Sequence, residues 1–209
     1  MEIHKLQINT TATFLTQGNP KTAKNIIFAL HGYGQLSQFF IKKFESLSKD
    51  YFLVIPEGLH RFYLQGTGGR VGASWMTKEK REDDIKDYIK YLDSVWSLFS
   101  ENRNIESKIL LGFSQGGATA SRWQQFGNFN ANKFILWAGV FPPDMPQNWE
   151  TNFKKCKNYF IVGNNDPYYN SDRIEQQSQY FTKNDVNFTT KVFSGKHEIE
   201  TKMLLEICS

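Results

Sequence analysis

The stretch SKILLGFSQGGATASRW, residues 107–123, decides the fold class. A short apolar run ends at Gly112, Ser114 stands alone between glycines, and a small-residue pattern typical of a helix follows. Apolar runs of this length that end in glycine are typical of buried strands. The stretch therefore predicts a strand, a sharp turn and a helix, with the serine in the turn.

Other short apolar runs have the same character and mostly end in glycine or a turn residue. They are NIIFALHG (25–32), YFLVIPEG (51–58), KFILWAGVF (133–141) and NYFIVGNND (158–166). Near-continuous apolar strands suit a parallel sheet covered on both faces. Helical patterns lie between them, most clearly over residues 80–100, and the first 20 residues suggest two antiparallel strands at one edge. The alternation predicts an α/β fold with a mostly parallel sheet and helices on both faces.

The composition indicates one soluble domain. The chain has 209 residues, 40% of them apolar, so we expect a single domain over residues 1–209. Its formal charge of +4 comes from scattered residues, and no motif or basic stripe predicts nucleic-acid binding. No signal-peptide order and no bilayer-spanning window is present. We expect a cytoplasmic protein without a membrane anchor, and the sequence leaves the oligomeric state open.

Residues 112–116, GFSQG, match the G-x-S-x-G pattern in the strand–turn–helix context that this motif requires. A nucleophilic serine needs a strained turn that lifts its hydroxyl above the sheet. Side chains at Gly112 and Gly116 would collide with the neighbouring helix and strand. The pentapeptide alone also fits a glycine-rich turn with a capping serine. The context favours Ser114 as a nucleophile.

A serine hydroxyl needs a base, and the base needs an acid that fixes its tautomer. Of the four histidines only His197 follows Ser114, and the triad order in this fold is serine, acid, histidine. Asp166 directly follows an apolar strand and is the best-placed acid, although an Asx turn before Pro167 also explains it. The other acids in this interval are Asp144, Glu150, Asp172, Glu175 and Asp185.

An oxyanion hole completes such a site, and its donors are two backbone N–H groups. One comes from the residue after the nucleophile, here Gln115, and the other from the loop after an earlier strand. FALHGYGQ (28–35) supplies that loop, with glycines on both sides of Tyr33. We interpret His31 as a buried brace for this loop rather than as a catalytic group.

Together these motifs resemble the α/β-hydrolase superfamily. GFSQGG, the early HGYG, DP after the penultimate strand and GKH near the end are most similar to the small carboxylesterase/phospholipase group that includes the acyl-protein thioesterases. The resemblance covers roughly residues 25–200 and implies the same roles for Ser114, Asp166, His197 and the two amides. It also implies ester or thioester substrates and no metal or organic cofactor.

One segment departs from that group. The group commonly has a Trp-aromatic-Asp sequence where this chain has Trp75-Met76-Thr77, so the acyl-side contacts are expected to differ. The insert at residues 60–78 is equally consistent with a lid or pocket wall and with a surface loop. As a wall, it would supply an apolar floor and a cation for an anionic substrate group, and the next loop would supply one more aromatic ring. The residues in these roles are Phe62, Tyr63, Trp75 and Met76 for the floor, Arg70 for the cation, and Phe141 for the ring.

Three functions compete at this point. The first is a serine carboxylesterase, thioesterase or lysophospholipase that forms an acyl-enzyme at Ser114. The second is another serine hydrolase such as a peptidase or acyltransferase. The third is a ligand-binding protein on a hydrolase fold. The complete set of catalytic residue types favours the first, with a small-molecule ester or thioester as substrate.

Overall fold

The computed structural model describes residues 1–47, 51–101 and 105–208. Its central sheet has the strand order β1-β3-β2-β6-β7-β8-β9, and a separate hairpin is formed by β4 and β5. The strands are β1 (Phe14–Gln17), β2 (Asn25–Leu30), β3 (Tyr51–Pro56), β4 (His60–Gln65), β5 (Gly68–Ser74), β6 (Ser107–Phe113), β7 (Lys133–Trp137), β8 (Lys157–Gly163) and β9 (Phe188–Phe193). The five apolar runs of the sequence are thus β2, β3, β6, β7 and β8.

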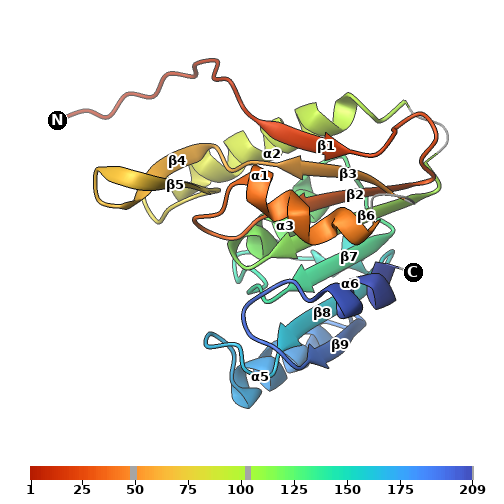
Figure 1. Cartoon of the computed structure of the whole chain (residues 1–209). Coiled ribbons are helices and arrows are strands. Elements are labelled where there is room, and N and C mark those ends of the chain that lie inside the picture. The colour runs from red at the N-terminus through yellow and green to blue at the C-terminus, as the bar shows by residue number, and fades with distance from the viewer. Residues whose placement is uncertain (48–50, 102–104, 209) are drawn as a thin grey trace.

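Helices cover both faces of this sheet, as predicted. They are α1 (Ser37–Phe40), the 3-10 helix η1 (Ile41–Leu47), α2 (Arg81–Ser97), α3 (Gln115–Phe126), α4 (Glu150–Phe153), α5 (Ser171–Lys183) and α6 (Thr201–Cys208). Figure 1 shows α1 and α6 in front of the sheet and α2 behind it.

Alternate residues of β2 belong to two separate hydrophobic clusters. Ile26 and Phe28 pack with residues of α2 and α3, whereas Ile27 and Ala29 pack with residues of η1 and α6. Successive side chains of a strand point to opposite faces. The continuous apolar sequence of this strand therefore indicates a sheet that is buried on both faces.

The N-terminal edge differs in part from the prediction. β1 pairs antiparallel with β3, so the antiparallel edge is confirmed, but one strand forms it rather than two. Residues 1–13 contain no strand and extend away from the sheet (Figure 1). In this segment Ile3, Leu6 and Ile8 are exposed. The alternation of polar and apolar residues suggested a strand, but these apolar side chains are not buried against the sheet.

Strand register brings the predicted site loops together at the carboxyl edge of the sheet. β2 and β6 run parallel with Leu30 opposite Gly112, so the loop after β2 starts beside the turn that holds Ser114. β8 and β9 run parallel with Gly163 opposite Phe193. Ligands bind outside the carboxyl ends of strands in open α/β sheets, so this edge is where a site is expected.

Candidate active site

Ser114 occupies a strained turn between β6 and α3. Its φ is 54° and its ψ is −119°, a conformation that residues with side chains rarely adopt. Its N–H donates to the Trp137 carbonyl at 2.9 Å. A Cβ at Gly112 would collide with the Gly116 carbonyl, and one at Gly116 would collide with the Leu30 carbonyl. Glycine is therefore required at both positions for the turn to close, as the sequence predicts.

His197 and Asp166 meet at the same edge of the sheet. His197 Nδ1 lies 2.7 Å from Asp166 Oδ2. The Asp166 side chain is fully buried, whereas 19% of the His197 side chain is exposed. Asp166 Oδ1 accepts the Tyr168 N–H at 2.9 Å, so the Asx-type turn exists alongside the histidine contact. Because a carboxylate faces Nδ1, that nitrogen carries the proton and Nε2 is the acceptor.

One cavity contains both the serine and the histidine. Its volume is about 930 Å³, and Ser114 and His197 both line it, within the size range of small-molecule sites. The Phe113 and Tyr168 rings flank the imidazole, with centroids 4.9 and 4.8 Å from it. The arrangement places a serine hydroxyl and an imidazole at one cavity, with a buried carboxylate bonded to the imidazole.

The other acids of this part of the chain have different surroundings. Asp172 and Glu175 are exposed on α5, and Asp185 is exposed in the turn before β9. Asp144 forms ion pairs with Arg122 and Arg81. Partial burial raises the pKa of Asp144, but hydrogen bonds from the two guanidinium groups outweigh it and hold the pKa at about 2.

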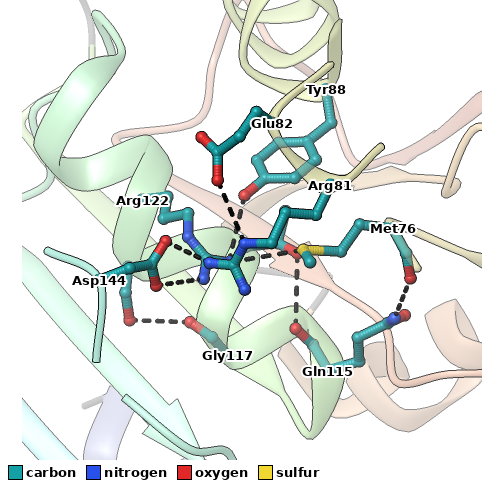
Figure 2. A network of polar contacts seen from close by, with 10 residues as sticks. Met76, Arg81, Glu82, Tyr88, Gln115, Gly117, Arg122 and Asp144 are labelled. Atoms are coloured by element: carbon teal, nitrogen blue, oxygen red, sulfur yellow. Dashed lines mark hydrogen bonds and ion pairs between the residues drawn. The ribbon is translucent and has the colours of Figure 1, made fainter. Parts of the chain in front are cut away.

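The Asp144 ion pairs belong to a network that reaches the start of α3 (Figure 2). Arg122 is almost fully buried, and its Nη1 lies 3.7 Å from Met76 Sδ. The Gln115 side-chain amide donates to the Met76 carbonyl at 2.9 Å. The network therefore joins α3, the residues after β5 and the loop after β7.

The two predicted oxyanion donors lie at the same cavity. Tyr33 and Gln115 both line it with Ser114. Within the described residues, neither amide N–H donates to a backbone or side-chain acceptor. The Tyr33 loop is fixed by the Gly34 N–H, which donates to the Ala73 carbonyl at 2.9 Å. Both N–H groups are thus unpaired among the described residues.

His31 has the bracing role that the sequence suggested. It is fully buried, its Nδ1 lies 2.8 Å from the Gly32 carbonyl, and its Nε2 accepts the Gly58 N–H at 2.9 Å. The ring is therefore neutral, with its proton on Nδ1. Burial lowers the pKa of His31 below its ordinary value, against the opposing effect of the Gly32 carbonyl.

This buried histidine predicts a pH dependence of stability. Below about pH 6.5 the unfolded chain takes up a proton at His31 that the folded chain resists, so the free energy of unfolding falls as the pH drops from 7 to 5. The contribution is at most about 1.4 kcal/mol per pH unit. Urea denaturation across this range checks it. His31→Gln should lower stability at pH 7 and give a shallower slope, and an unchanged slope would remove His31 as the cause.

The 60–78 insert forms the β4–β5 hairpin, and it packs on the Tyr33 loop rather than over the cavity. Phe62 contacts the Tyr33 ring, with centroids 4.9 Å apart, and Tyr63 is exposed. Arg70 lines a second cavity of about 450 Å³, together with Lys43. Figure 1 shows the hairpin projecting from the body of the protein, because its two strands pair with each other and not with the central sheet.

The predicted apolar floor is therefore wrong in its main residues. Trp75 is fully buried in the core, and its Nε1–H donates to the His31 carbonyl at 2.8 Å. Met76 is held in the Arg122 network. Of the six predicted pocket residues, which are all described, Phe141 alone lines the cavity that contains Ser114.

The segment after Asp166 forms one wall of the cavity, although the sequence pattern did not predict it. Tyr168, Tyr169 and one face of α5 line the cavity, and that face consists of Arg173, Gln176, Gln177 and Tyr180. The sequence feature that could have predicted this wall is the spacing of three and four residues between these side chains, in a helix that starts at the carboxyl edge of the sheet. The polar character of most of them made this face resemble a solvent-exposed surface.

Two further classes of feature are absent from the described residues. No three His, Cys, Asp or Glu side chains come together there as they would around a metal ion. None of the helices in that part of the chain has the length and apolar composition needed to cross a membrane.

A mostly parallel sheet covered on both faces, with a strained serine between a central strand and the next helix, is the α/β-hydrolase fold. The model of the family described as "Serine hydrolase (FSH1)" matches residues 21–203. The chain therefore belongs to this family and is a serine hydrolase.

Solved structures agree on the fold. Zea mays acyl-protein thioesterase 2 has a TM-score of 0.72 and 16% identity over 95% of this chain and 96% of that chain. Esterase PE8 has a TM-score of 0.69 and 19% identity over 95% and 100% of the respective chains. The Bacillus cereus carboxylesterase has a TM-score of 0.67 and 15% identity over 95% and 92%. None of the curated proteins matches the sequence.

Proposed function

We propose that this serine hydrolase acts on carboxylic esters or thioesters through a Ser114–His197–Asp166 triad. The observation that carries the proposal is the hydrogen bond between His197 and the buried Asp166 at the cavity that Ser114 also lines. A base that is oriented by a buried acid and placed near a strained serine is the arrangement that nucleophilic catalysis requires.

The reaction proceeds in two stages. Ser114 Oγ bonds to the substrate carbonyl carbon as its proton passes to His197 Nε2, and the Tyr33 and Gln115 N–H groups stabilise the resulting oxyanion. His197 then gives its proton to the departing alcohol or thiol, which leaves an acyl-enzyme. In the second stage His197 activates a water, which releases the carboxylic acid and restores Ser114.

The mixed polar and apolar lining of the cavity supports a small ester, a lysophospholipid or a thioester as the substrate. Val140, Phe141 and Pro143 form an apolar part of the wall. We also propose a cytoplasmic location because Cys156 and Cys208 are free thiols, the usual state in a reducing compartment.

Hydrolysis of p-nitrophenyl esters from acetate to palmitate tests this function. We expect kcat/KM to rise by up to about fourfold per methylene, the equivalent of about 0.8 kcal/mol, until the chain outgrows the cavity. The p-nitrophenolate released in a continuous absorbance assay gives the rate. A folded wild-type protein that hydrolyses none of these esters would contradict the proposal.

A further inference from the structure

The wall of the Ser114 cavity is unbalanced in charge. Its lining includes Arg173, and among the described residues that form it there is no aspartate or glutamate. The buried Asp166 lies behind the catalytic imidazole and is already bound to His197 and the Tyr168 N–H. A concave site lined by one sign of charge attracts ligands of the opposite sign.

Arg173 differs from three of the other four described arginines in having no carboxylate partner. Arg61, Arg81 and Arg122 each form an ion pair, whereas Arg173 forms none with the described residues. Its Nη1 instead donates to the Tyr168 carbonyl at 2.9 Å. A carbonyl positions the guanidinium without neutralising it, and a guanidinium has five N–H donors. Most of its hydrogen-bonding capacity remains for a ligand.

Tyr169 also lines this wall. Only 8% of the residue is exposed, and its buried hydroxyl lies beside Gln177. The side-chain amide of Gln177 also accepts the Phe141 N–H and donates to the Gly139 carbonyl, each at 3.2 Å. Among the described residues of this wall, Arg173 carries the charge.

Arg173 lies at the His197 end of the cavity. The Tyr168 ring contacts the imidazole, and Tyr168 also accepts the Arg173 hydrogen bond. Tyr180 lies seven residues further along α5, about 10 Å by helical rise, and contacts the Phe141 ring. The cavity thus has a cationic end near the proposed base and an aromatic end further away.

We propose that Arg173 binds an anionic group of the substrate, a carboxylate or a phosphate, a few bonds from the scissile carbonyl. The preferred substrates are then esters or thioesters that carry a negative charge. This inference rests on the proposed function for its location in the reaction. The anion belongs either to the acyl part or to the leaving group, and matched probe pairs distinguish the two.

The acyl-side pair is mono-(4-nitrophenyl) glutarate, which has a free carboxylate, and methyl 4-nitrophenyl glutarate, in which that carboxylate is esterified. The leaving-group pair is S-acetyl-3-mercaptopropionate and its methyl ester. We expect kcat/KM to favour the anionic member of one pair by about tenfold or more, as for a hydrogen bond between charged groups. Arg173→Met should abolish that preference by slowing the anionic probe alone, and Arg173→Lys should retain part of it. Lys183→Met is the matched control, because it removes the same charge from the last turn of α5, outside the cavity lining.

Equal kcat/KM values within both pairs would overturn the inference, and so would a preference for the anionic probe that survives in Arg173→Met. In either case, turnover of the neutral probes would still support the proposed hydrolase function. If no probe is hydrolysed, the proposed function fails, and calorimetric titration with glutarate decides the anion site separately. Binding by wild type and Lys183→Met that weakens in Arg173→Met supports the site. No binding by wild type, or equal binding by all three proteins, overturns it.

Discussion

Replacing Ser114 with alanine is expected to lower ester turnover by about five to six orders of magnitude, because no other group can form the acyl-enzyme. The backbone at this position is held by the Trp137 carbonyl and by the close contacts of Gly112 and Gly116, so alanine should keep the turn. Initial rates on the best p-nitrophenyl ester, with circular dichroism of both proteins, measure the effect.

Ser94→Ala is the matched control for this variant. Ser94 lies on α2, its hydroxyl donates to the Lys90 carbonyl, and it does not line the cavity. We expect wild-type turnover from it. A folded Ser114→Ala protein with turnover within tenfold of wild type would remove Ser114 from the mechanism.

Asp166→Asn is expected to lower kcat by about a thousand- to ten-thousandfold with little change in KM. An amide at this position can present its NH₂ group to His197 Nδ1, which favours the wrong imidazole tautomer, while the shape of the site is kept. Steady-state kinetics on the same ester separate kcat from KM.

Asp172→Asn removes one negative charge six residues away, on the exposed side of α5, and should leave both constants unchanged. The reverse pattern, with a slow Asp172→Asn and an unaffected Asp166→Asn, would show that the acid has been assigned wrongly. Asp144 needs no such comparison, because Arg81 and Arg122 already engage its carboxylate.

The central sheet and the proposed catalytic residues were predictable because their signals are local. Each parallel strand is buried on both faces, so each appears in the sequence as a short continuous apolar run that ends at a turn. The order of strands then brings loop residues of distant segments to one edge. The contact between Asp166 and His197, 31 residues apart, followed from that rule and from the small number of histidines.

The β4–β5 hairpin was not predictable in the same way. Its strands are exposed on most of their length, so no periodic pattern reported them, and the glycines suggested a loop. Trp75 resembled a pocket aromatic because its core contacts come from distant segments, such as the His31 carbonyl 44 residues away in the chain. Such a contact exists only after the sheet has formed.

The α5 wall shows the opposite limitation. Arg173 and Gln177 have the residue types of a solvated helix face, and only the three-dimensional fold turns that face toward Ser114. The sequence also predicted a cation for an anionic substrate group, but at Arg70, which lines a different cavity. The type of group was inferred from chemistry, whereas its position required the packing of α5.

Labelling with a fluorophosphonate identifies the nucleophile. The wild-type protein is treated with the reagent, digested, and analysed by mass spectrometry for the modified peptide. We expect one modified residue, Ser114, and no labelling of Ser114→Ala. Modification of another residue in the wild type, with the Ser114 peptide unmodified, would contradict it.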